Sequence, residues 1–189
     1  SLVFYGCTSS ESNRSIAAPV HGTNMVDTDN NIYLSVVIGT QTWTQKNLYV
    51  THYRNGDPIP QKSSYDSWWT STTGAYCLIG TNDATGIIYG IMYNKAAITD
   101  PRGLVPLGWH IPTAEEWDIL ATTLGGNAIA GGKMKSVNSW FSPNTGATNS
   151  SGFTALPSGY RDNQDLPPLG FYCGWWSTSI LNVNAGGGI

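Results

Sequence analysis

A chain of 189 residues has the length of one ordinary domain with a short extension. Its net charge of -3 and its 11% of charged residues supply neither a basic surface for nucleic acid nor an acidic run that would keep the chain unfolded. Eight Trp and ten Tyr against four Phe, together with 22 Gly, are typical of a loop-rich domain in which hydrogen bonds hold the aromatic side chains. No apolar run approaches the ~20 residues of a transmembrane helix, so we expect no membrane span.

Residues 1–25 precede the predicted domain, which spans 26–189, and we interpret them as a tether or a strand. The apolar segment Leu2-Val3-Phe4-Tyr5-Gly6-Cys7 is followed by polar residues, an order that resembles the end of a bacterial lipoprotein signal with Cys7 as the lipidated residue. Tyr5 is bulkier than the residue that such signals prefer. The alternative is a short apolar strand that pairs with this domain or with a neighbour.

The domain opens with a predicted β-hairpin. An Asx-rich turn at 27–31 leads into the β-branched run 32–38, and a second turn precedes a strand that carries Trp43. Residues 27–31 also match the first ligand positions of a calcium-binding loop. Ile32 and Ile38, however, occupy the positions where that loop needs Gly and a bidentate Glu, so we interpret the segment as a plain turn.

Helices are predicted in the second half of the chain, which gives an α+β fold class. Between residues 51 and 86, turn signals alternate with short aromatic runs, and we expect long surface loops and extended pieces there. The main helix is predicted over 113–124, where Thr113 and Glu116 form a capping box and two glycines follow the last turn. Its apolar face consists of Trp117, Leu120, Ala121 and Leu124. A second, shorter helix over 129–136 contains two glycines, which lower its intrinsic stability.

Three cysteines leave two interpretations open. If Cys7 carries lipid, Cys77 and Cys173 remain as a pair that an oxidising compartment would join in a disulfide. The alternative is two separate buried thiols. Sequence spacing alone does not show that the two Cα atoms lie within the ~7 Å that a bridge requires.

A series of short motifs follows the order that is characteristic of one bacterial family. They are Ile38-Gly39-Thr40-Gln41-Thr42-Trp43 with Asn47-Leu48, Thr73-Gly74-Ala75-Tyr76-Cys77, Tyr89-Gly90 with Tyr93-Asn94, Gly108-Trp109-His110-Ile111-Pro112-Thr113 with Glu116-Trp117, Gly131-Gly132-Lys133-Met134-Lys135, the stretches 142–149 and 152–161, and Trp175-Trp176-Ser177-Thr178-Ser179. Through these motifs residues 26–179 resemble the Fibrobacter succinogenes major paralogous domain. The resemblance implies a C-type-lectin-like fold, related also to formylglycine-generating enzymes, in secreted or lipid-anchored proteins of Bacteroidetes-like bacteria, and it implies no established activity.

The chain departs from the family pattern in two places. Members usually have Leu-Cys-Pro before Gly-Trp-His, where this chain has Leu104-Val105-Pro106. They also usually continue past the Trp-Trp-Ser-Thr motif to a last strand with Arg-Cys-Val. We interpret both differences as the joint loss of one family disulfide and the final strand. A sheet edge left open in this way would be available to a second copy or another subunit by strand addition.

Neither the histidines nor the cysteines predict an active site. His110 lies near Glu115 and Glu116, but no second His or Cys offers a nucleophile with a companion base, so we interpret it as a buried structural imidazole. The Arg-Gly-Gly-Ser context of formylglycine-generating enzymes is absent around Cys77 and Cys173. We therefore expect no catalytic residue, no metal and no cofactor.

Aromatic and polar loop side chains are the remaining candidates for function. Adjacent Trp residues in an extended chain point to opposite faces, so one member of each pair, 68–69 and 175–176, is expected in the core. The aromatic residues either belong to the core alone or also form a platform on which sugar rings stack. The predicted ligand-binding residues are Tyr65, Trp68, Arg161, Asp162, Asn163 and Trp175.

The sequence therefore predicts a non-catalytic binding module outside the cell or on the surface of a bacterium, with a glycan or a protein as its ligand. The alternative is a structural subunit of a surface filament that assembles by strand addition. A formylglycine-type oxidase is a third hypothesis, and it rests only on Cys77 and Cys173.

Overall fold

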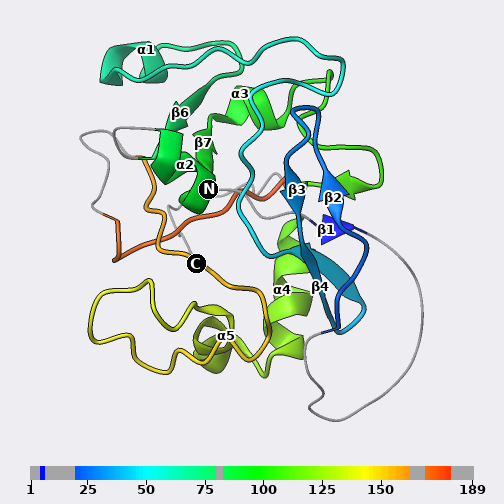
Figure 1. Ribbon diagram of the computed structural model, residues 1–189, viewed down its shortest axis with the longest axis vertical. Coiled ribbons are helices and arrows are strands. Elements are labelled where there is room, and N and C mark those ends of the chain that lie inside the picture. The colour runs from blue at the N-terminus through cyan, green and yellow to red at the C-terminus, as the bar shows by residue number, and fades with distance from the viewer. Residues whose placement is uncertain (1–4, 7–19, 80–82, 162–168, 180–189) are drawn as a thin grey trace.

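The computed structural model describes residues 5–6, 20–79, 83–161 and 169–179 (Figure 1). It is a mixed α/β structure with short antiparallel strands and few helices, which confirms the expected class at this level. The strands are β1 (Tyr5–Gly6), β2 (Met25–Val26), β3 (Ile32–Tyr33), β4 (Ser35–Ile38), β5 (Gln41–Thr44), β6 (Tyr76–Leu78), β7 (Ile91–Tyr93) and β8 (Trp109–His110). The helices are α1 (Tyr65–Trp69), α2 (Asp83–Tyr89), α3 (Lys95–Ile98), α4 (Ala114–Thr123) and α5 (Asn127–Met134). Within these ranges no helix combines the length and the apolar character that crossing a membrane requires.

The predicted hairpin is confirmed in β4 and β5. The two strands pair antiparallel from Ser35 opposite Thr44 to Ile38 opposite Gln41, so residues 39 and 40 form the turn. Gly39 has a φ of 63°, a left-handed value that glycine adopts at the lowest cost. A Cβ at this position would lie 2.9 Å from the Thr123 side chain of α4. The turn therefore packs closely against the helix because residue 39 is glycine.

The N-terminal residues supply a strand to the same sheet. The order of its four strands is β4-β5-β1-β8, and Tyr5 of β1 lies opposite Trp43 on one side and His110 on the other. Of the two interpretations of the N-terminal segment, the structure contains the strand that pairs with its own domain. Cys7 lies outside the described residues, so its lipidation stays a prediction.

The Asx-rich segment between β2 and β3 is a turn built around Asp27. One carboxylate oxygen of Asp27 accepts hydrogen bonds of 2.9 Å from the backbone N–H groups of Asp29 and Asn31. The other oxygen accepts from the Asn31 amide and, at 2.6 Å, from the Tyr33 hydroxyl. The segment is thus a hydrogen-bonded Asx turn, as the sequence predicted.

The main helix is confirmed, including its capping box. The Thr113 hydroxyl accepts from the Glu116 N–H at 3.2 Å, and the Glu116 carboxylate accepts from the Thr113 N–H at 2.8 Å. The shorter helix is confirmed as well, although α5 begins and ends two residues before the predicted bounds of 129 and 136. In Figure 1, α4 lies beside β4, and α5 lies on the other side of α4, in the lower part of the view.

The predicted apolar face of α4 packs against this sheet. Leu120 and Leu124 are buried in one cluster with Val36 and Trp43, and Trp117 and Ala121 cover that cluster at its border. Phe153, from the long loop after α5, belongs to the same cluster. A second core cluster contains Tyr33, Tyr53 and Tyr93, from β3, the loop after β5, and β7.

The conformation of residues 65–69 differs from the expected extended piece. They form α1, in which the Ser64 hydroxyl caps the first turn by accepting from the Ser67 N–H. Trp68 is buried in a third core cluster with Cys77 and Met92. A short polar segment with a serine cap and one buried anchor is stable as a single helical turn only because tertiary packing supplies that anchor.

Candidate functional site

An aromatic cavity of about 650 Å³ is lined by residues of α1, β7 and α3 and by the segment around residue 175. Its volume falls in the range of ~300–1,000 Å³ that small-molecule sites occupy. The aromatic residues that line it are Trp68, Trp69, Tyr93, Tyr160, Trp175 and Trp176. The polar residues in the lining are Ser71, Asn94, Lys95, Thr99 and Arg161.

Three of the predicted ligand-binding residues meet in this cavity, namely Trp68, Arg161 and Trp175. Asp162 and Asn163 lie outside the described residues, as does the side chain of Tyr65. The structure therefore brings together α1 and the segment around 175, which are more than a hundred positions apart in the sequence.

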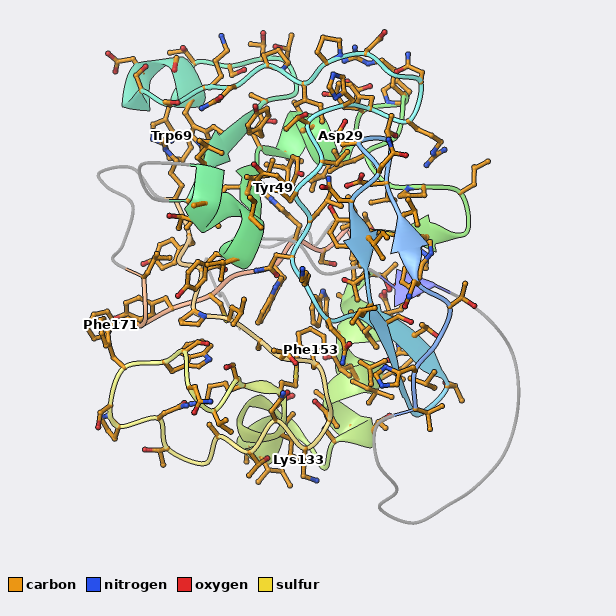
Figure 2. The ribbon with its side chains drawn as sticks, viewed as in Figure 1. Asp29, Tyr49, Trp69, Lys133, Phe153 and Phe171 are labelled. Atoms are coloured by element: carbon orange, nitrogen blue, oxygen red, sulfur yellow. The ribbon has the colours of Figure 1, made fainter. Side chains whose placement is uncertain are left out.

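The adjacent pair in α1 divides between core and surface, as predicted, but through a helix and not through an extended chain. Trp68 is 8% exposed, whereas Trp69 is 46% exposed. Trp69, which was not among the predicted site residues, is thus the member of the pair that presents its ring at the surface (Figure 2).

Neutral groups hold Arg161 in the wall of the cavity. Its guanidinium carbon lies 5.2 Å from the centre of the Trp68 ring, and its Nη2 donates to the Ser63 carbonyl at 3.0 Å. Arg161 also lies near the Cys77 thiol, where it opposes the rise in the pKa of that thiol that burial causes. Because a carbonyl, a ring and a thiol carry no net charge, these contacts position the guanidinium without neutralising it.

Trp175 is fixed from two sides. Its Nε1 donates to the Asn47 side-chain oxygen at 3.0 Å, and its ring stacks on Trp117 with 5.7 Å between the ring centres. Asn47 is itself buried, and its amide donates to the Tyr89 carbonyl at 2.7 Å. Asn47 is therefore a positioning residue for this wall of the cavity.

The opposite wall depends on Asn94. Its side-chain oxygen accepts from the Ala97 N–H, which caps α3, and from the Ala75 N–H, both at 2.9 Å. Next to it, the Trp176 Nε1 donates to the Tyr93 carbonyl at 2.8 Å. The N–H groups of both C-terminal indoles are thus engaged inside the protein, and what these rings offer to the cavity is their apolar surface.

Sequence reasoning missed the contributions of Trp69, Lys95 and Tyr160 to the site. One signal was present for Lys95, because Asn94 followed by Lys-Ala-Ala is typical of a helix N-cap and first turn. The position of Tyr160 carried no local signal. It follows from the pairing of Gly159 with Cys173, which places two distant loop segments next to each other.

Cys77 and Cys173 are free thiols in the structure. Of the two interpretations, the structure contains the separate thiols and not the disulfide. Cys77 is buried and Cys173 is partly buried. Burial raises the pKa of the Cys77 thiol and raises that of Cys173 to about 12. Both groups are accordingly protonated at neutral pH, and a protonated thiol is a poor nucleophile.

His110 is not the buried imidazole that the sequence predicted. Its side chain is 43% exposed, and its Nε2 lies 2.8 Å from the Glu116 carboxylate, the same group that caps α4. The capping box explains the difference, because it holds Glu116 at the helix start, where the carboxylate faces β8. His52 pairs with Asp29, far along the chain from His110.

A second cavity, of about 620 Å³, lies beside the Asx-rich turn and includes His52 and Asp29. The Asp29 carboxylate accepts from the Thr51 N–H and hydroxyl and contacts the His52 ring. Despite the cost of burial, these hydrogen bonds hold the pKa of Asp29 below its usual value. Because internal partners occupy the polar groups here, the aromatic cavity is the better candidate for ligand binding.

Comparison with known proteins identifies the family. No curated protein and no solved structure matches the chain significantly. The model of the Fibrobacter succinogenes major domain matches residues 36–186, which include all of the motifs described above. The chain therefore belongs to the Fibrobacter succinogenes major domain family.

Proposed function

We propose that this protein is a non-catalytic binding module whose ligand occupies the aromatic cavity. The observation that carries the proposal is the exposure of large rings at the cavity, where Trp69 is 46% and Tyr160 is 42% exposed. A folded protein gains ~25 cal/mol for each Å² of apolar surface that it buries, so rings left in water at a concave site are typical of ligand recognition.

The chemistry of the remaining polar groups supports a binding role over catalysis. Both described thiols have raised pKa values, which opposes formylglycine-type cysteine chemistry. The carboxylate nearest to His110 is engaged in capping α4. The lining of the aromatic cavity includes neither of these thiols, nor His110 or its carboxylate partner. The described lining residues thus include no nucleophile with a companion base.

A place outside the cell or on the bacterial surface, and a C-type-lectin-like fold, complete the proposal. Both come from the family resemblance. An exposed aromatic cavity fits such a module, because a rigid scaffold positions the side chains of its loops for contact with a ligand.

Binding of the full chain to a glycan array and to surface-protein extracts, followed by calorimetry on the best ligand, tests the proposal. Trp69→Ala removes an exposed ring and is expected to weaken binding at least about tenfold while leaving the unfolding midpoint unchanged. Leu107→Ala, at a side chain that is 81% exposed and outside the cavity, is the control. Ligands that bind both variants as tightly as the unaltered protein would show that the cavity is not the site.

The structure of β1 favours a second candidate function, that of a subunit joined by strand addition. Tyr5 and Gly6 occupy the position between β5 and β8, which an identical segment of a neighbouring copy would fill with the same hydrogen bonds. Tyr5→Pro removes a backbone donor from β1 and is expected to abolish concentration-dependent assembly in light scattering. A protein that is monomeric at all concentrations before the substitution would rule this candidate out.

A further inference from the structure

Arg102 and Arg161 both lie over aromatic rings. They differ in whether a described carboxylate pairs with the guanidinium charge. Arg102 lies over Tyr53 at 3.9 Å and forms ion pairs with Asp57 and Asp100, at 3.1 and 2.8 Å. Arg161 lies over Trp68, and its contacts with described residues are with the neutral groups named above. Among the described residues no carboxylate forms an ion pair with Arg161.

The aromatic cavity contains a second cation and no anion in its described lining. Lys95 is exposed at the start of α3, and Asp and Glu are absent from the residues that line the cavity. The protein as a whole carries a net charge of -3. A positive site on a negatively charged protein is electrostatically complementary to a ligand that carries an anionic group.

A row of exposed rings leads away from the cavity. It begins at Tyr160, in the cavity lining, and continues through Tyr172, Phe171 and Phe141, with 6.0, 6.3 and 4.7 Å between successive ring centres. Each of these side chains is at least 42% exposed. Backbone hydrogen bonds from Gly159 to the Tyr172 carbonyl and from Phe141 to the Gly170 carbonyl hold the row in place.

We infer that the ligand is a linear acidic oligosaccharide, with the carboxylate of a uronic acid bound by Arg161 and Lys95 and the following sugars lying along the row of exposed rings. The inference rests on the proposed function and names the class of ligand for the same site. Arginine and lysine provide charge-assisted hydrogen bonds to a carboxylate. The apolar C–H faces of pyranose rings pack on indole and phenol rings, and a row of such rings fits a chain better than a single sugar.

The composition of the cavity favours a sugar over a peptide. Among the described lining residues none is Leu, Ile or Val, and Met92 is 4% exposed, so the apolar surface that the cavity offers is mainly aromatic. The lining pairs aromatic faces with hydroxyl and amide groups, such as those of Ser71, Thr99 and Asn94. Rings and small polar groups together match the alternating C–H and O–H surface of a carbohydrate.

Calorimetry with defined oligomers tests the inference. The probes are tetramers of galacturonic, glucuronic and mannuronic acid, each compared with its carboxyl-reduced neutral counterpart, and tetraglutamate as an acidic peptide. At least one uronate is expected to bind about tenfold or more tightly than its neutral counterpart, and its advantage is expected to shrink as salt rises. Equal affinity for the acidic and neutral forms, absence of binding to every uronate, or equally tight binding of tetraglutamate would overturn the inference.

Three variants assign the effect to the named residues. Lys95→Gln is expected to weaken uronate binding about tenfold, whereas Lys46→Gln, an equal loss of charge at an exposed lysine outside the cavity, leaves it unchanged. Tyr172→Ala is expected to weaken binding of the tetramer about fivefold and to leave binding of the single uronic acid unchanged. Equal effects of the two lysine variants would refute a specific cation site.

The outcomes also separate this inference from the proposed function. If neutral sugars or proteins bind and Trp69→Ala abolishes that binding, the cavity is the ligand site but the acidic specificity is wrong. If Trp69→Ala leaves every interaction unchanged, the proposed function itself fails.

Discussion

Two aromatic networks of this protein have similar ring spacings and opposite exposure. In the buried network, Trp43, Trp117, Phe153 and Trp175 contact one another with ring centres 4.8 to 6.2 Å apart, and Trp43 and Phe153 are 0% and 1% exposed. In the row that starts at Tyr160, centres lie 4.7 to 6.3 Å apart, yet every ring is at least 42% exposed. Figure 2 shows Phe153 inside the molecule and Phe171 at its edge.

The difference teaches that ring–ring contact does not by itself identify a core. In the buried network, Trp43 of β5 and Trp117 of α4 join Phe153 and Trp175 from loop segments, within the core between the sheet and α4. The row is borne by loop backbone around residues 141, 160 and 172, where hydrogen bonds order the chain but do not enclose the rings. The first network stabilises the fold, and the second is available to a ligand. Trp175 belongs to the first network and also lines the cavity, so it connects the two.

The strongest test of this comparison removes one ring from each network. Phe153→Ala is expected to lower the free energy of unfolding by ~3–5 kcal/mol, because it leaves a cavity in the core. Phe171→Ala is expected to change it by less than ~0.5 kcal/mol, since the ring is 52% exposed. Urea unfolding followed by tryptophan fluorescence measures both values. A large loss in the Phe171 variant would mean that the row is part of the core.

A smaller effect is expected at two adjacent glycines of α5, which support the loop that carries Phe153 and Phe141. A Cβ on Gly132 would lie 2.4 Å from the Gly146 carbonyl oxygen, whereas a Cβ on Gly131 would meet open space. Gly132→Ala is therefore expected to destabilise the protein by ~1–3 kcal/mol, and Gly131→Ala to stabilise it by up to ~1 kcal/mol. Thermal unfolding of the two variants checks the opposite signs, and a shift in the same direction would contradict the close helix–loop contact.

The smallest expected effect is the contribution of the Asp100–Arg102 ion pair to the free energy of unfolding. Hydrogen bonding to Arg102 lowers the pKa of Asp100 to about 2, below the value of ~3.9 for an unfolded aspartate. The ionised carboxylate therefore stabilises the fold above pH ~3.9, and this contribution is lost as the pH falls toward 2. Because Arg102 is partly exposed, we expect less than ~1 kcal/mol.

Asp100→Asn isolates this contribution. The variant is expected to be less stable than the unaltered protein at neutral pH, and the difference is expected to shrink as the pH falls from ~3.9 through 2, as measured by urea unfolding across that range. A stability difference that does not vary with pH would show that Asp100 acts through packing and not through its charge.

Local signals predicted the parts of the fold that depend on neighbours in sequence. The hairpin with Gly39 in its turn, the capping box of Thr113 and Glu116, and the Asx turn at Asp27 all follow from side chains that bond to backbone within a few residues. The helical state of 65–69 was not predictable in this way, because it depends on burying Trp68 against distant residues.

For the site, the sequence by itself determined the family and the aromatic, polar character of the loops, and it named Trp68, Arg161 and Trp175. Only the tertiary structure decided which rings are exposed, that the two thiols are free, and that Lys95 shares a cavity with Arg161. The physical reason is that burial and the pairing of charges depend on contacts between segments far apart in the chain, whereas turns and caps depend on contacts within a few residues.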